Sequence, residues 1–163
     1  MRPPATRTDS RRRYPLVIVD SSTVVAILLG EPNADAVLAR LALYAERLMS
    51  VANYVETGTV LAGRRHGDRA DAIRDLDEFL DTAGIALAPI DAGQARVALE
   101  ARIRFGRGMG HGGALNFGDT FAYALAKARS APLLYVGNDF ARTDVVAALR
   151  PGGGRRGTAG EAD

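Results

Sequence analysis

The stretch "YPLVIVDSSTVVAILLG" (residues 14–30) sets the fold class of this chain. Its first half is an apolar run with three β-branched residues, and it ends in an acid, Asp20. A run of this kind is typical of a strand that is buried on both faces, as in a parallel sheet. The second half changes to helical spacing and stops at Gly30. The stretch therefore predicts a buried parallel strand followed directly by a helix.

Predicted strands and helices alternate along the rest of the chain. Further strands are expected at 48–51, 85–90 and 131–137, and helices at 31–48, 52–67, 68–84, 91–106 and 119–130. The helix at 68–84 is expected to place these apolar residues on one side: Ala70, Ile73, Leu76, Phe79 and Leu80. This alternation predicts an α/β domain with a mainly parallel sheet over 15–150. The basic N-terminal extension (1–14) and the Gly-rich tail (151–163) are expected to be disordered.

The composition excludes several classes of site. The chain has 163 residues, which fits one domain, and it has no cysteine and only two histidines, His66 and His111. Disulfides, a zinc-thiolate site, a Cys nucleophile and a His-rich metal site are therefore excluded, and any metal should be a hard, oxygen-liganded ion. The absence of cysteine suits the cytoplasm. The net charge of +2 permits a nucleic-acid partner without demanding one, and no apolar run is long enough to span a membrane.

Four acids fall near the edge of the predicted sheet where ligands bind in such folds. Asp20 ends the first strand, Glu56 lies about one turn into the helix at 52–67, Asp119 opens the helix at 119–130, and Asp139 follows the last strand. Four carboxylates converging on one place would repel each other, and a divalent cation removes that repulsion. Mg²⁺ and Mn²⁺ prefer carboxylate oxygens and water, and they support phosphoryl chemistry. The pattern therefore indicates a nuclease site.

Each acid also has a purely structural interpretation. Asp119 and Asp20 can serve as helix N-caps, and Glu56 can pair with Arg64 or Arg65. Asp139 and Asp144 can be turn residues, and for Asp144 the turn is preferred.

Four segments together resemble the PIN-domain family. They are "VIVDSSTVVAILLGEP", "SVANYVETGTVL", "LNFGDTFAYALAKA" and "LLYVGNDFARTDV", and they occur in order across residues 16–149. More narrowly, they resemble VapC-type toxins of bacterial type II toxin–antitoxin pairs. The resemblance implies a three-layer fold with a central parallel sheet of strand order 3-2-1-4-5, flanked by helices. A translation start nearer Leu16 would resemble the family more closely.

The resemblance also implies roles for single residues. The acids of the family site fall on Asp20, Glu56, Asp119 and Asp139, and Asn138 or Asp144 could share the last position. Ser22 matches a small polar residue that lines the same site. We expect Asp20 and Asp119 to hold Mg²⁺, for which Mn²⁺ can substitute, with Asp139 assisting. Glu56 should orient or deprotonate the attacking water.

The same resemblance implies an activity and partners. Family members are Mg²⁺- or Mn²⁺-dependent ribonucleases that a small antitoxin blocks, and they commonly form homodimers. The expected partners are therefore RNA, a cognate antitoxin and a second copy of the chain. Exposed apolar residues between Asn33 and Leu48 could form either the antitoxin groove or the dimer face.

Other interpretations are weaker. "GMGHGG" (108–113) matches G-x-G-x-x-G but follows a helix, so it lacks the context of a dinucleotide site. It is expected to be a loop at the rim of the site, where Arg104, Arg107 and His111 could contact RNA. "VIVDSST" lacks the second acid of haloacid dehalogenase-type phosphatases. The main alternative is a non-catalytic PIN-like module that binds RNA or protein without cutting.

Overall fold

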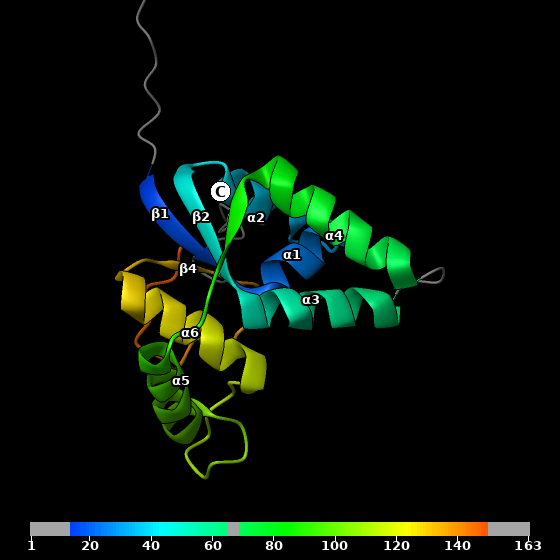
Figure 1. The fold of residues 1–163 in the computed structure, drawn as a ribbon. Helices are drawn as coiled ribbons and strands as arrows, with labels where there is room; N and C mark the ends of the chain where they lie inside the picture. Colours follow the sequence, from blue (N-terminus) through cyan, green and yellow to red (C-terminus); the bar gives the residue numbers. More distant parts are fainter. Residues whose placement is uncertain (1–13, 65–68, 150–163) are drawn as a thin grey trace, which may run out of the picture.

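The computed structural model describes residues 14–64 and 69–149, and within them it contains four strands and six helices (Figure 1). In chain order these are β1 (Tyr14–Val19), α1 (Ser21–Leu28), α2 (Ala34–Leu41), β2 (Tyr44–Ser50), α3 (Val51–Arg64), α4 (Arg69–Ala83), β3 (Ile85–Ala88), α5 (Ala92–Phe105), α6 (Phe117–Arg129) and β4 (Leu133–Leu134). The expected N-terminal extension, except Tyr14, and the tail from 151 lie outside these residues. No helix in the described part is long and apolar enough to cross a membrane.

The strands form one parallel sheet in the order β3-β2-β1-β4. Successive residues of β1 face opposite sides, as the period of two in a strand requires. Val17 and Val19 are buried against α1 to α4, whereas Ile18 is buried against α5 and α6. Figure 1 shows these two groups of helices on opposite sides of the sheet. The predicted three-layer α/β fold is therefore confirmed.

Within the described residues, the sheet has one strand fewer than the predicted order 3-2-1-4-5. Where a fifth strand would lie, Ala147 makes a single parallel bridge with Leu133. Leu133 N–H donates to Val146 O, and Ala148 N–H donates to Leu133 O. The last segment thus occupies the expected place beside β4 but pairs over too short a length to be a strand.

The predicted helix at 31–48 is wrong in its second half. Helix α2 ends at Leu41, and β2 begins at Tyr44, because this segment pairs with β1 on one side and β3 on the other. The Arg47 guanidinium donates to the carbonyl oxygens of Leu41, Tyr44 and Ala83, which ties the end of α2 and the end of α4 to the strand. Pairing within the sheet thus overrides the helical spacing of the apolar residues.

The buried face of α4 also differs from the prediction. Leu76 and Leu80 are buried as expected, but the third fully buried residue is Ala72. Ala70 is exposed, and Ile73 is 51% exposed. Helix α4 packs against α3 along only part of its apolar stripe, so Ile73 borders an open groove between the two helices.

Candidate functional site

A cavity of about 280 Å³ lies at the carboxyl ends of the parallel strands. All four predicted acids line it, together with Ser22. The complete lining consists of Asp20, Ser21, Ser22, Val25, Glu31, Glu56, Val60, Arg64, Asn116, Asp119, Val136, Asp139 and Phe140. Residues that are distant in the sequence meet here because β1, β2 and β4 all end at this edge, and α3 and α6 begin there.

Asp20 caps α1 with one carboxylate oxygen. Its Oδ2 accepts hydrogen bonds from Ser22 N (3.0 Å) and Ser22 Oγ (2.6 Å). Its Oδ1 is buried and has no hydrogen-bond partner among the described residues. Burial raises the pKa of Asp20 to about 6, and the nearby Glu56 charge adds to that effect against the opposing hydrogen bonds from Ser22. The cap therefore leaves Oδ1 without a partner among the described residues, and burial makes the charge of this carboxylate costly.

Asp119 belongs to a capping box rather than serving as the N-cap. Helix α6 begins at Phe117, two residues earlier than predicted, and Asn116 is its N-cap. Asn116 Oδ1 accepts from Asp119 N (2.8 Å), and Asp119 Oδ2 accepts from Asn116 N (2.7 Å). Burial raises the pKa of Asp119 to about 7, and the charges of Asp20, Asp139 and Glu56 contribute to the increase. The carboxylates thus repel each other across the cavity.

Glu56 is held by hydroxyl and amide donors. Its Oε2 accepts from Ser21 Oγ (2.5 Å) and from Asn53 Nδ2 (3.3 Å). Its carboxyl group also lies directly against Gly118, where an added Cβ would collide with it. It does not pair with Arg64, whose Nη1 lies 3.4 Å from Glu31 Oε1. The other suggested partner, Arg65, lies outside the described residues.

Asp139 occupies the fourth position of the cavity. Its Oδ1 lies 3.8 Å from Nη2 of Arg107, the residue just before the Gly-rich loop at 108–113. Arg104 instead lies over the ring of Phe105. Asp144 does not line the cavity. It accepts from Tyr123 Oη (2.7 Å) and Lys127 Nζ (3.1 Å), and these partners hold the pKa of Asp144 below its usual value.

Sequence reasoning missed several residues of the site. Ser21 and Asn53 hold Glu56, Asn116 pairs with Asp119, and Glu31 and Arg64 form an ion pair on the cavity wall. Ser21 and Asn116 lie beside or near a predicted acid in the sequence. Their proximity to the acids could have indicated a role in the site. Proximity in the sequence does not, however, show which polar neighbour points into the cavity.

The donor set fits a hard divalent cation that keeps most of its water. In the described part of the chain, no three acidic or histidine side chains are close enough to form a complete site by themselves. Mg²⁺, however, is commonly held by one or two carboxylates, with water and substrate phosphate completing the coordination. The unpartnered Oδ1 of Asp20 and the mutual repulsion of the acids favour such an ion.

The raised pKa values predict how the metal-free protein responds to pH. A carboxyl group whose pKa rises on folding stabilises the fold fully below its unfolded pKa, and this contribution is lost as pH rises through its folded pKa. In EDTA, the free energy of unfolding should therefore fall between about pH 4 and pH 8, through the pKa values near 6 and 7. Asp20 alone should contribute roughly 2–3 kcal/mol to this loss. The measurement is urea unfolding of the wild-type chain and of Asp20→Asn/Asp119→Asn. Equal pH dependence of the two proteins would contradict the prediction.

Comparison with known proteins is consistent with this geometry. A family model described as PIN domain matches residues 17–146. Ribonuclease VapC42 of Mycobacterium tuberculosis is 43% identical over 129 residues, covering 79% of this chain and 96% of that protein. Ribonuclease VapC28 of the same organism is 44% identical over 135 residues, covering 82% of this chain and 98% of that protein.

Solved structures agree on the fold. The crystal structure of Mycobacterium tuberculosis VapC20, described as a sarcin-ricin loop cleaving toxin, superposes with a TM-score of 0.66 at 18% identity, covering 83% of this chain and 99% of that chain. A chain from VapBC2 of Rickettsia felis bound to a promoter DNA fragment superposes with a TM-score of 0.63 at 16% identity. The superposition covers 81% of this chain and 96% of that chain. With the family match and the close relatives, the predicted resemblance is confirmed: this chain belongs to the PIN-domain family and, within it, to the VapC ribonucleases.

Proposed function

We propose that this chain is a metal-dependent endoribonuclease toxin that hydrolyses RNA phosphodiester bonds in the cytoplasm and is inhibited by a cognate antitoxin. The observation that carries the proposal is the convergence of Asp20, Glu56, Asp119 and Asp139 on one cavity, where Asp20 Oδ1 has no hydrogen-bond partner within residues 14–64 and 69–149. Relatives at 43% and 44% identity that are named ribonucleases support it.

The chemistry divides among the four acids. Asp20, through Oδ1, and Asp119 would hold Mg²⁺ or Mn²⁺, with Asp139 assisting directly or through water. When bound, the ion would neutralise charge on the phosphoryl group and make a bound water more acidic. Both hydrogen bonds that the described residues make to the Glu56 carboxylate fall on Oε2. Oε1 would therefore be the atom that takes a proton from the attacking water.

The proposed reaction is a single in-line hydrolysis. Water forms a new bond to phosphorus, and the bond from phosphorus to the 3′ oxygen breaks. Glu56 receives one proton of the water, and the leaving 3′ oxygen takes a proton from solvent. The products would carry a 5′-phosphate and a 3′-hydroxyl.

The test is cleavage of total RNA by purified protein freed of any copurifying partner. The reaction with Mg²⁺ or Mn²⁺ is compared with an EDTA control and with Asp20→Asn/Asp119→Asn. Discrete fragments that disappear in both controls would support the proposal, and their ends would identify the target. Intact RNA together with no metal binding would favour the non-catalytic module.

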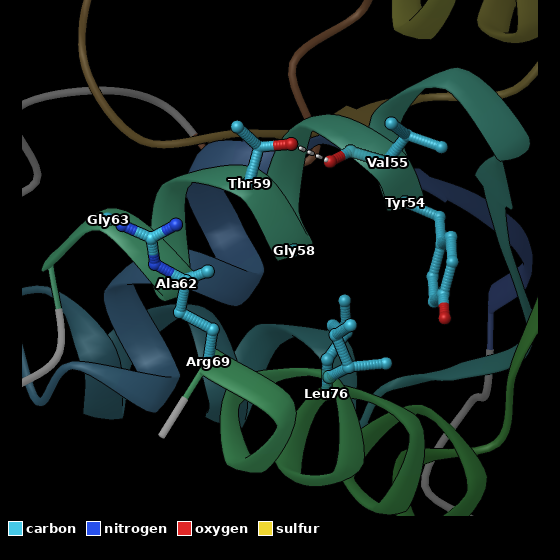
Figure 2. Close-up of a pocket in the computed structure, with 9 residues that line it drawn as sticks. Tyr54, Val55, Gly58, Thr59, Ala62, Gly63, Arg69 and Leu76 are labelled. Carbon is cyan, nitrogen blue, oxygen red and sulfur yellow. Dashed lines mark hydrogen bonds between the residues drawn. The ribbon is translucent and has the colours of Figure 1, made fainter. Parts of the chain in front are cut away.

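The antitoxin is proposed to bind an apolar groove between α3 and α4. This groove has a volume of about 620 Å³ and is lined mainly by small and apolar side chains (Figure 2). Figure 2 shows Tyr54 at one end, Arg69 at the other, and Leu76 pointing from α4 toward α3. Tyr54 Oη donates to Asp77 Oδ1 (2.8 Å), which joins the two helices at that end. An apolar helix of the antitoxin would fit here, and it would bind the same helix that carries Glu56.

This location differs from the segment that the sequence suggested. Between Asn33 and Leu48 the large apolar side chain that is exposed is Leu38, at 45%. The α3–α4 groove instead exposes Val55 (63%) and Ile73 (51%) on its two walls. The homodimer stays a prediction, and the exposed Phe117, edge-on to Phe121, is an apolar surface available for it.

We expect Ile73→Glu to weaken binding of the antitoxin encoded beside this chain by about tenfold or more, since it places a charge in an apolar contact. The cleavage rate of the free toxin should not change. Leu99→Glu is the matched control, because Leu99 is 60% exposed on α5, away from the groove. The dissociation constants are measured by titration calorimetry. Equal weakening by both variants, or none by Ile73→Glu, would place the antitoxin elsewhere.

A further inference from the structure

We propose that Asn53 is a positioning residue of the site, and that its buried amide fixes the Glu56 carboxyl group by tying together the elements that carry three of the acids. The proposal rests on the proposed function for the role of Glu56 in the reaction. The contacts of Asn53 themselves do not depend on that role.

The Asn53 side chain is fully buried, and the two N–H groups of its amide are shared among three acceptors. Its Nδ2 lies 3.1 Å from Gly118 O, 3.1 Å from Ser21 Oγ and 3.3 Å from Glu56 Oε2. The carbonyl oxygen of Gly118 can only accept, so it fixes which end of the amide faces inward. Ser21 Oγ accepts from Asn53 and donates to Glu56 Oε2 (2.5 Å). The two donors thus form a directed chain that ends at the carboxylate.

The partners of Asn53 lie beside the acids of the site. Ser21 follows Asp20 at the start of α1, and Gly118 precedes Asp119 in the first turn of α6. Asn53 itself lies one turn before Glu56 on α3. One amide therefore joins α1, α3 and α6 at the points where they present Asp20, Glu56 and Asp119 to the cavity.

Gly118 also contacts the Glu56 carboxyl group. An added Cβ at this position would overlap the Glu56 carboxyl group, so the carboxylate lies directly against the α6 backbone. Asn53 and Ser21 donate to Oε2 of the carboxylate, and Gly118 leaves the space that the carboxyl carbon and both oxygens occupy. This accounts for a glycine immediately before Asp119, where the backbone φ does not require one.

Stability alone does not account for the choice of asparagine. Asn53 Oδ1 is buried without a hydrogen-bond partner among the described residues, and such an atom costs free energy. Thr57, one turn later on α3, is equally buried, and its hydroxyl donates only within its own helix, to Asn53 O (2.7 Å). Asn53 thus carries a cost that Thr57 avoids, and it makes cross-links that Thr57 does not.

The test compares Asn53→Ala and Ser21→Ala with Thr57→Val, which removes a buried hydroxyl from the same helix. Cleavage of a short RNA spanning the mapped site is measured under multiple turnover. We expect Asn53→Ala and Ser21→Ala to lower kcat by about 10- to 100-fold, because small displacements of reacting groups have effects of this size. KM should stay within about twofold. Thr57→Val should lower the melting temperature and leave kcat unchanged. Unchanged kcat in Asn53→Ala and Ser21→Ala, or an equal loss in Thr57→Val, would overturn the proposal.

A crystal structure of Asn53→Ala supplies a readout that does not depend on activity. We expect the Glu56 carboxyl group to move away from Gly118 while Asp20 keeps its bonds to Ser22. An unmoved Glu56 would overturn the positioning role. If the wild-type chain cleaved no RNA but Glu56 moved in this variant, the proposed function would fail and the positioning role would stand. Ser21→Ala repeats the structural test if Asn53→Ala does not fold.

Discussion

Asp119→Asn is expected to lower kcat for RNA cleavage by about 1,000-fold or more, because a carboxylate that holds the metal contributes several kcal/mol to the transition state. The helix should survive the change. An asparagine at 119 can still accept from Asn116 N through its amide oxygen, so the capping box is retained. Removing a charge whose pKa is raised to about 7 should also make the metal-free protein more stable at pH 8. The variant should thus be inactive but well folded.

Asp144→Asn is the matched control for this prediction. Asp144 is the nearby acid that the sequence left open as a possible sharer of the Asp139 position, and it pairs with Tyr123 and Lys127 outside the cavity. The kcat of Asp144→Asn should stay within about twofold of the wild-type value, since a partly exposed ion pair contributes little to the stability of the fold. Both kcat values are measured under multiple turnover with saturating Mg²⁺ and saturating RNA. Full activity in Asp119→Asn, or its loss in Asp144→Asn, would show that the site is assigned to the wrong residues.

The grouping of the acids could be predicted because topology alone brings them together. In a parallel sheet with helical crossovers the carboxyl ends of the strands share one edge, so Asp20 at the end of β1 and Asp139 after β4 must lie near each other. The sequence preferred Asp139 and left Asp144 open as a residue that could share its position. Excluding Asp144 required the structure, since the backbone path of a loop does not follow from its spacing. Likewise, the role of Asn53 does not follow from the sequence, because it depends on the packing of α3 against α6.

The errors in the predicted fold have a common cause. Residues 44–48 have apolar spacing that suits a helix, and only pairing with β1 and β3 makes them a strand. Ile73 follows the apolar stripe of α4, yet it is exposed because α3 packs along a different part of that helix. In both cases the local pattern is ambiguous, and contacts with residues far away in the sequence decide the outcome.

Glu56→Gln is expected to lower kcat by roughly 100- to 10,000-fold, the range that general base catalysis supplies. Ser21 Oγ and Asn53 Nδ2 both donate to the Oε2 position, so the amide of glutamine must place its oxygen there. Its NH₂ group would then replace Oε1 and face the cavity. A donor would stand where the attacking water needs an acceptor, although the side chain keeps its shape and its contact with Gly118.

A metal-binding measurement distinguishes the expected loss of the general base in Glu56→Gln from the expected loss of a metal ligand in Asp119→Asn. Mg²⁺ should still raise the melting temperature of Glu56→Gln, because Asp20 and Asp119 are intact, and a bound ligand stabilises the folded state. The same addition should have little effect on Asp20→Asn/Asp119→Asn. The melting temperature with Mg²⁺ reports metal binding, and kcat under multiple turnover reports catalysis. Together the two measurements assign metal binding and proton transfer to different residues. If Mg²⁺ failed to stabilise Glu56→Gln, Glu56 would be a metal ligand rather than the base. If the variant kept its rate, water would be activated without this carboxylate.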